Sequence, residues 1–540
     1  MPVAATYPGV YIEEIPSGVR TITGVATSIT AFVGKALRGP TDQPVTITSF
    51  GDYERIFGGL YRDIVLSYAV RDFFLNGGAQ AIIVRLYKAV SGSAAKALFE
   101  VPNSTLEAAS EGAWGMQVRV RVDKKSDVDA NADPNLQAVA LRLGVQPTDL
   151  FDLTVRDGGT GVVESFRNLT TKESAQRADR VLQSGSMLVR AASVLSLPSD
   201  TAPSAHTGAL TDADVWTAVG KSTAAKNTQS ADVAVDSEPL DSNAYKGSQS
   251  SKTGLYQLEK ADLFNLLCIL PDARGGDVSN DVYQEALSYC VKRRAMLIVD
   301  PKNSWNSVSA AQSGVPGMGL NGDMARNGAI YFPRIKQADS QLGGQIETFV
   351  PCGTIAGVMA RTDSQRGVWK APAGIDASLA GVAGLQVEMT DAENGLLNPL
   401  GINCLRTFPV YGRVAWGART LRGADAAADE YKYVPVRRLA LFIEESLYRG
   451  TQWVVFEPND EPLWSQIRLN LGGFMNNLFR QGAFQGKTPA EAYFVKCDKE
   501  TTTQNDINLG IVNIIVGFAP LKPAEFVIIK LQQMAGQIAT

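Results

Sequence analysis

Hydrophobic periodicity gives the first 90 residues a clear secondary structure. Continuous apolar runs at 28–33 and 81–86 predict buried strands. Between them, apolar residues recur every four positions over 63–75, which predicts an amphipathic helix. A glycine pair at 77–78 ends that helix, because glycine tolerates positive φ. Strand, helix and strand in this order predict a βαβ-like unit.

The pattern changes in the middle of the chain. Residues 91–255 are dominated by Ala, Ser, Asp and Thr, and polar and apolar residues alternate strictly over 116–122. Such alternation predicts a half-exposed strand, and 139–143 and 153–155 are further strand candidates. We predict a β-rich insert whose last part, 220–252, is a polar loop with few large apolar residues.

After the insert the α/β pattern returns, so the insert is expected to interrupt one α/β domain. The remaining predicted elements are strands at 263–270, 294–300 and 453–456, helices at 282–294, 351–363, 433–450 and 463–479, and a hairpin of 492–496 with 511–518.

Both ends of the chain have the composition of β-strands. The strand-like residues are Val10, Tyr11 and Ile12 near the start, and Phe526, Val527, Ile528 and Ile529 near the end. Prolines and glycines adjoin both runs. A strand at a terminus needs a partner, which is either the chain's own sheet or the sheet edge of a neighbouring copy. The pattern alone leaves both possibilities open.

Short motifs near both ends resemble those of contractile tail sheath proteins of phages and related injection systems. The N-terminal motifs are Tyr7-Pro8-Gly9-Val10-Tyr11, Ala31-Phe32-Val33-Gly34, Phe73-Phe74-Leu75-Asn76-Gly77-Gly78 and Ile83-Val84-Arg85. The C-terminal motifs are Arg419-Thr420-Leu421, Tyr433-Val434-Pro435-Val436-Arg437-Arg438, Phe456-Glu457-Pro458-Asn459, Val516-Gly517-Phe518-Ala519-Pro520 and Pro523-Ala524-Glu525-Phe526. The resemblance covers roughly 1–90 and 350–540, and residues 90–255 resemble nothing we can name.

The resemblance implies a structural subunit that polymerises helically around an inner tail tube and contracts to drive the tube through a target envelope. It implies exchange of terminal arms between neighbours, and contacts with the tube, baseplate and tail-terminator proteins. It also implies assembly in the bacterial cytoplasm as part of a virion tail or a tail-like particle. The residues expected to face the tube are the charges of the helix at 433–450, namely Arg437, Arg438, Glu444 and Glu445.

The expected fold class is therefore α/β (α+β mixed) and multi-domain. The expected parts are an N-terminal arm at 1–22, an α/β domain at 23–90 and 256–345, an inserted outer domain at 91–255, a C-terminal inner domain at 346–520 and a C-terminal arm at 521–540. The insert is expected to face outward and to be dispensable for the lattice.

Composition argues against several other functions. The net charge is −4, so no global basic field attracts nucleic acid, and no apolar run reaches the length of a membrane span. Five scattered cysteines predict free thiols, and a single histidine excludes a multi-histidine metal site. We expect no cofactor, no direct nucleic-acid contact and no stable membrane insertion.

No catalytic motif is convincing either. Lys252-Thr253 lacks the glycines of a phosphate loop, Asp157-Gly158-Gly159 is a turn, and His206 lies in a polar stretch without a nucleophile motif. Neighbouring acids, such as Glu444 with Glu445, point in different directions on a helix and do not share one site. We predict that the chain is not an enzyme. A self-assembling surface-layer protein is the alternative, and a large α/β enzyme is less favoured.

Overall fold

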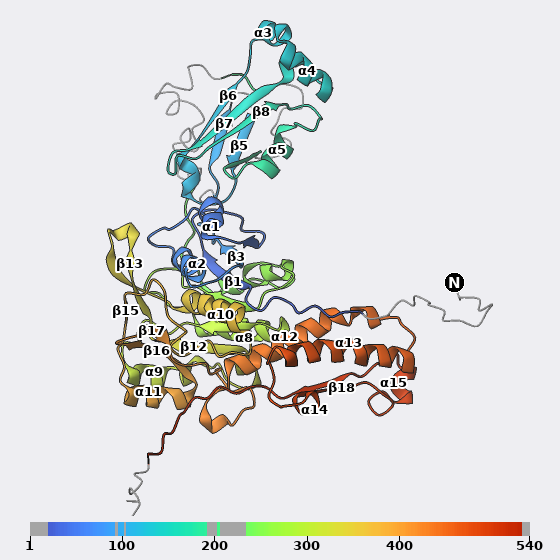
Figure 1. The fold of residues 1–540 in the computed structure, drawn as a ribbon. Coiled ribbons are helices and arrows are strands. Elements are labelled where there is room, and N and C mark those ends of the chain that lie inside the picture. Colours follow the sequence, from blue (N-terminus) through green and yellow to red (C-terminus); the bar gives the residue numbers. More distant parts are fainter. Residues whose placement is uncertain (1–19, 92–94, 102–103, 192–201, 206–233, 532–540) are drawn as a thin grey trace, which may run out of the picture.

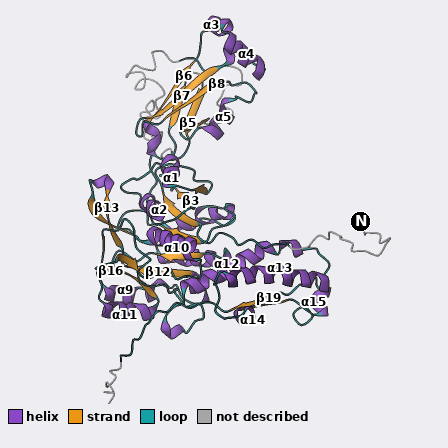
Figure 2. Cartoon of the chain, viewed as in Figure 1, coloured by secondary structure: helices purple, strands orange, loops and turns teal. Residues whose placement is uncertain are grey.

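The computed structural model describes residues 20–91, 95–101, 104–191, 202–205 and 234–531. Three parts are visible in Figure 1: a central sheet with helices on it, an insert above it, and a long helical hairpin at its side. Figure 2 shows that strands dominate the insert, whereas helices dominate the side part.

An eight-stranded, mostly parallel sheet forms the centre. Its strands are β1 (Thr30–Lys35), β2 (Val45–Ile47), β3 (Ala81–Leu86), β10 (Leu266–Ile269), β11 (Met296–Val299), β12 (Gly328–Phe332), β16 (Ile402–Phe408) and β17 (Gly412–Ala415). They are ordered β17-β16-β12-β11-β10-β1-β3-β2. Only the edge strands β2 and β17 are antiparallel to their neighbours. The inner strands are mostly apolar because both faces of the sheet are buried.

Helices cover both faces of this sheet. One face carries α1 (Phe50–Phe57), α2 (Val65–Leu75) and α10 (Cys352–Arg366). The other carries α7 (Ser242–Lys246), the 3-10 helix η5 (Gly254–Lys260), α8 (Asn280–Lys292), α9 (Val308–Gly314) and α11 (Asp391–Leu397). A small sheet of β13 (Ile335–Asp339), β14 (Gln345–Phe349) and β15 (Gly384–Leu385) lies beside it. The prediction of a mixed α/β fold is confirmed.

The insert has its own core between two three-stranded antiparallel sheets. The sheets consist of β4 (Leu98–Val101), β5 (Ser104–Ala108) and β9 (Val189–Ala191), and of β6 (Val118–Asp123), β7 (Phe151–Asp157) and β8 (Val163–Leu169). Its helices are α3 (Asp127–Ala132), α4 (Pro134–Leu143) and α5 (Ala178–Gly185). A buried salt bridge of 3.1 Å joins Asp157 of the insert to Arg38 of the central part.

The helical side part has a hydrophobic core of its own. It contains α12 (Val434–Gly450), the 3-10 helix η11 (Gln452–Val454), α13 (Glu461–Arg480), α14 (Pro489–Ala492), β18 (Tyr493–Lys496), α15 (Gln504–Asn508) and β19 (Ile515–Phe518). The two long helices are antiparallel in Figure 1, and β18 pairs with β19 as the predicted hairpin.

Two predicted strands are wrong. Residues 139–143 belong to α4, because Asp133 caps that helix and Pro134 occupies its first turn. Residues 453–456 form the end of η11 and a turn. Both runs are short and apolar, and periodicity alone cannot distinguish a strand from a helical turn in such a run.

The structure also moves two expected domain boundaries. Tyr245 and Leu255 pack in the core of the central sheet, so the chain has left the insert before residue 255. At the other boundary, α10 and β16 lie on or in the central sheet, although both follow residue 345. The separate core at the C-terminal side begins only at α12, apart from Ile22 and Val368. Long-range pairing of β12 with β16, which no local pattern reveals, causes this difference.

Within the described ranges, no helix is long and apolar enough to cross a membrane.

Candidate assembly interface at the chain ends

The segment from Arg20 to Ser28 lies across the helical hairpin. The Arg20 N–H donates to Asn470 Oδ1 at 3.1 Å, and the Val25 N–H donates to Ser446 Oγ at 3.2 Å. Ile22 is buried, and its side chain fills the space left by the absent side chain of Gly450. The helical hairpin thus binds this segment through both backbone hydrogen bonds and apolar packing, so the arm expected at 1–22 cannot extend as far as Ile22.

A buried arginine fixes the end of this segment. The Arg438 guanidinium donates to Asp363 Oδ1 at 2.9 Å and to the Thr27 carbonyl at 2.9 Å, while Thr27 Oγ1 donates to Asp363 Oδ2 at 2.7 Å. The side chains of Arg438 and Asp363 are 3% and 4% exposed. Arg438 therefore joins α12, α10 and the start of the chain, and its expected position on a tube-facing surface is wrong.

The three other charges expected to face a tube have different positions. Glu445 is buried and accepts hydrogen bonds from Arg294 at 2.9 Å and Arg449 at 2.8 Å, so it is not on a tube-facing surface either. Arg437 is partly buried and pairs with Glu444 at 3.2 Å. Of the four, only Glu444 is exposed, with 42% of its side-chain surface accessible. Helical periodicity failed here because α12 packs on more than one side.

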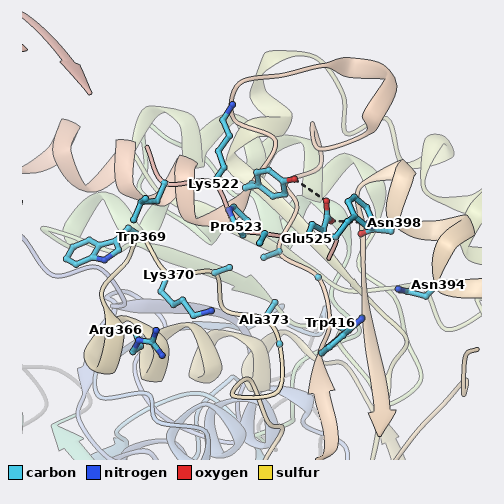
Figure 3. A pocket seen from close by; sticks show the side chains of 18 of the residues that line it. Arg366, Trp369, Lys370, Ala373, Asn394, Asn398, Trp416, Lys522, Pro523 and Glu525 are labelled. Carbon is cyan, nitrogen blue, oxygen red and sulfur yellow. Dashed lines mark hydrogen bonds between the residues drawn. The ribbon is translucent and has the colours of Figure 1, made fainter. Parts of the chain in front are cut away.

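The last described segment, Leu521–Leu531, leaves the helical part as extended chain, and Glu525 anchors it (Figure 3). Arg419, which is fully buried, donates to both Glu525 oxygens at 2.7 Å. Asn398 and Tyr433 add hydrogen bonds of 3.0 and 3.1 Å. Burial opposes ionisation of Glu525, but these donors, Arg419 foremost, hold its pKa below the ordinary value.

Beyond Glu525 the chain becomes apolar and exposed. The large side chains of this run are 72–94% exposed, and they are Phe526, Val527, Ile528, Ile529 and Leu531. Within the described part of the chain, none of these residues belongs to a strand. An extended apolar run without a sheet partner is the kind of segment that adds to the sheet edge of another molecule.

The hairpin β18–β19 offers such an edge. The two strands form a sheet of their own, so each has an outer edge without a strand partner among the described residues. Phe494 and Ile515 are both about half exposed on this hairpin. Unpaired N–H and C=O groups beside exposed apolar side chains favour the addition of a further strand.

A large groove lies beside the anchored segment (Figure 3), and we call it the arm groove. Its volume is about 1080 Å³. Residues 521–526 form one wall, and Trp369, Lys370 and Trp416 contribute to the others.

Four candidate residues singled out in the sequence are not among those that the structure describes. These are Val10, Tyr11, Ile12 and His206. Among the residues that the structure describes, no cluster of three His, Cys, Asp or Glu could hold a metal ion, and all five cysteines are buried free thiols. Arg419 and Glu525 both lie within the motifs that resemble sheath proteins, but no local pattern indicates that they pair.

Sequence comparison finds two matches to tail sheath proteins. Residues 426–533 match the family model described as the phage tail sheath C-terminal domain. The chain is also 30% identical over 127 residues to the tail sheath protein of Vibrio phage KVP40. That match covers 23% of this chain and 18% of the phage protein.

Similar folds are found among solved structures. The chain matches a chain of the anti-feeding prophage baseplate with a TM-score of 0.55 and 21% identity, covering 98% of this chain and 100% of the other. A sheath complex of an extracellular contractile injection system in the contracted state gives 0.56 and 21%, with 98% of each chain covered. A sheath tail protein from Listeria innocua gives 0.55 and 12%, covering 93% and 96%. These likenesses, together with the sequence matches, confirm the predicted resemblance to contractile sheath proteins. The matched family is a structural one and not an enzyme family, in line with the prediction from the sequence.

Proposed function

We propose that this chain, a homologue of contractile sheath proteins, is the subunit of a contractile tail sheath that assembles helically around an inner tube. One observation carries the proposal: an exposed, extended apolar run, 526–531, leaves the subunit from Glu525, which the buried Arg419 anchors. Such a run would cost solubility in an isolated protein, whereas between subunits it supplies main-chain hydrogen bonds and apolar area.

The acceptor in this proposal is the β18–β19 hairpin of a neighbouring copy. Both open edges of that hairpin offer unpaired backbone groups, and its half-exposed apolar residues give the added strand something to pack on. Residues 1–19, which include Val10, Tyr11 and Ile12, would supply a second exchanged strand. Main-chain ladders would then hold neighbours together while the packed faces between them change during contraction.

The partners follow from this role. Copies of the chain form the sheath, and the tube, baseplate and tail-terminator proteins contact it, within a virion tail or a tail-like particle assembled in the bacterial cytoplasm. The insert is proposed to face outward for two reasons. It has a core of its own, and its contact with the central part, which includes the Arg38–Asp157 salt bridge, is narrow. Of the charges on α12, Arg437 and Glu444 remain the ones proposed to face the tube.

Electron microscopy of the purified chain tests the function. We expect hollow striated tubes, whereas flat sheets would support a surface-layer protein and discrete particles with turnover would support an enzyme. Ending the chain at residue 525 keeps the anchor and removes the exposed run together with residues 532–540, so we expect a folded monomer that forms no tubes. Normal tubes from that truncation would remove the C-terminal arm from the proposal.

A matched truncation separates the two ends. A chain that begins at residue 20 keeps every described contact of the start segment and lacks only residues 1–19. We expect it to fold with unchanged thermal stability and to lose tube formation as well.

A further inference from the structure

Phe456 is a fully exposed aromatic residue at the tip of the turn between α12 and α13. Val454 accepts a hydrogen bond from the Glu457 N–H at 3.2 Å, and Val455 has φ −67° and ψ 129°. With φ +70° at Phe456, these values describe a type II turn whose third position normally requires glycine. A bulky aromatic residue there is strained and buries nothing within the subunit, so subunit stability does not explain it.

The turn is nevertheless held firmly. Asn459 donates to the Ile511 carbonyl at 3.0 Å and accepts from the Trp464 indole N–H at 2.9 Å. The Asp460 side chain caps α13 by accepting the Leu463 N–H at 3.2 Å. The aromatic side chain is therefore presented on a rigid base, which lowers the entropy lost on binding.

The chemistry of this knob, residues Val455–Glu457, matches that of the arm groove. The knob carries two exposed apolar side chains followed by an acidic one. The arm groove has Trp369 and Trp416 for apolar contact. The basic residues Arg366, Lys370 and Lys522 also line it, and its two acidic residues, Asp391 and Glu525, are already paired with Arg406 and Arg419. Its volume of about 1080 Å³ is ample for an aromatic side chain and its neighbours.

Knob and groove lie at opposite ends of the helical hairpin. The knob follows the end of α12, whereas Tyr433 before α12 and Gln481 after α13 line the groove. The 17 residues of α12 separate the two sites by roughly 25 Å, from a rise of about 1.5 Å per residue. A knob cannot reach the groove of its own subunit, and a head-to-tail contact between different surfaces builds rings or helices.

We propose that the Phe456 knob of one copy inserts into the arm groove of the next copy. This inference rests on the proposed self-assembly and adds to it a contact that does not involve strand exchange. Phe456 supplies the apolar anchor, and Glu457 pairs with the basic residues of the groove, foremost Lys370. Because residues 521–526 form one wall of the groove, an occupied groove also braces the base of the C-terminal arm.

Phe456→Gly is the first test in the full-length chain. Glycine removes the aromatic ring and relieves the positive φ, so the melting temperature should stay unchanged or rise. The protein concentration needed for half-maximal tube formation should increase about tenfold or more, as for an interface anchor. Leu141→Ala, which truncates a highly exposed side chain on the insert, serves as the matched control and should change neither quantity. Unchanged tube formation by Phe456→Gly would overturn the proposal.

A charge swap identifies the partner surface. Glu457→Lys and Lys370→Glu should each weaken assembly, and the double variant should recover most of the loss. A double variant no better than the single ones contradicts the pairing. Loss of tube-protein binding by Glu457→Lys with normal self-assembly would instead place the knob against the inner tube, and would equally overturn the proposal.

A peptide-binding assay tests the knob–groove contact independently of tube formation. A fluorescein-labelled peptide of residues 454–460 should bind full-length Phe456→Gly protein, and binding should fall about tenfold with serine in place of phenylalanine. No binding of the parent peptide contradicts the inference. If the wild-type chain forms no tubes while the peptide binds, the proposed sheath function fails and the knob–groove contact stands.

Discussion

The two described ends of this chain are both held by a buried arginine, but with opposite consequences. At the start, Arg438 pairs with Asp363 of the central part, and the segment itself contributes only Thr27. At the end, Arg419 pairs with Glu525, which belongs to the arm. The first charge pair is therefore part of the fold whether or not the arm is used. The second is a local fixing point, with a free apolar run beyond it.

The difference shows how one subunit can be stable and still offer a detachable strand. Ile22 packs residues 20–28 onto the helical core, and Arg438 binds the same segment at Thr27. Removing either the Ile22 or the Arg438 side chain therefore disturbs packing inside the subunit. Residues 526–531 contribute almost nothing to the subunit, so their apolar area remains for a neighbour. Substitutions at the two ends should therefore differ in how much they lower the unfolding free energy of the subunit.

Arg438→Ala should have the largest effect on the subunit. It leaves Asp363 buried without its arginine and removes the donor to Thr27, which costs about 3–5 kcal/mol of unfolding free energy. Urea denaturation measures the loss. Arg55→Ala removes an arginine whose side chain is mostly exposed and pairs with Asp52, and it should cost about 1 kcal/mol or less. Equal effects of the two variants would contradict the structural role of Arg438.

Ile22→Ala should come next, with a loss of about 2–3 kcal/mol, because it opens a cavity against Gly450 in the helical core. Thermal and urea unfolding report the change. Val128→Ala, at an exposed position on α3, controls for the loss of apolar volume and should lie within about 0.5 kcal/mol of wild type. A loss that small for Ile22→Ala would mean that the start segment is not bound in solution.

Glu525→Gln should lower the unfolding free energy by about 1–2 kcal/mol, because Arg419 keeps Asp425 as a charged partner at 2.9 Å and glutamine retains one oxygen acceptor. Its effect should be local: because all native cysteines are buried, a cysteine placed at position 528 can carry a fluorescent label, and that label should show lower anisotropy. Since the pKa of Glu525 is lowered in the folded chain, its stabilising contribution is present above the ordinary pKa of about 4.5.

That contribution is lost as the pH falls through the lowered pKa. In the chain with Glu525 intact, the anisotropy of the same label should therefore fall as the pH drops below about 4.5. The glutamine variant should show the low anisotropy on both sides of that pH. Absence of this pH dependence with Glu525 intact would show that Arg419 does not fix the arm.

Ile528→Asn should have the smallest effect on the subunit, within about 0.5 kcal/mol, because the side chain is 82% exposed. The same change should reduce tube formation strongly if 526–531 is an exchanged strand, because a polar residue would replace one that packs on the neighbour. Lys530→Asn offers a control within the same run. An Ile528 variant that assembles like wild type would weaken the contrast between the two ends.

Patterns along the chain predict most of the central sheet and the long helices. The strands at 28–33 and 81–86 and the helices at 63–75, 433–450 and 463–479 correspond to observed elements with small shifts of their ends. Local rules suffice there, because buried strands and amphipathic helices leave a periodic imprint on the chain. The strand-like composition of 526–529 likewise indicated a segment in need of a partner.

The positions of the α12 charges and of the arm anchors depend on how whole elements pack together. Periodicity gives one apolar face per helix, but α12 packs against α10, the start segment and Arg294 at once, so Arg438 and Glu445 become buried with their partners. Arg419 meets Glu525 across 106 positions of the chain, and Thr27 meets Arg438 across 411. Pairings at such separations depend on the packing of whole elements, which no local pattern records.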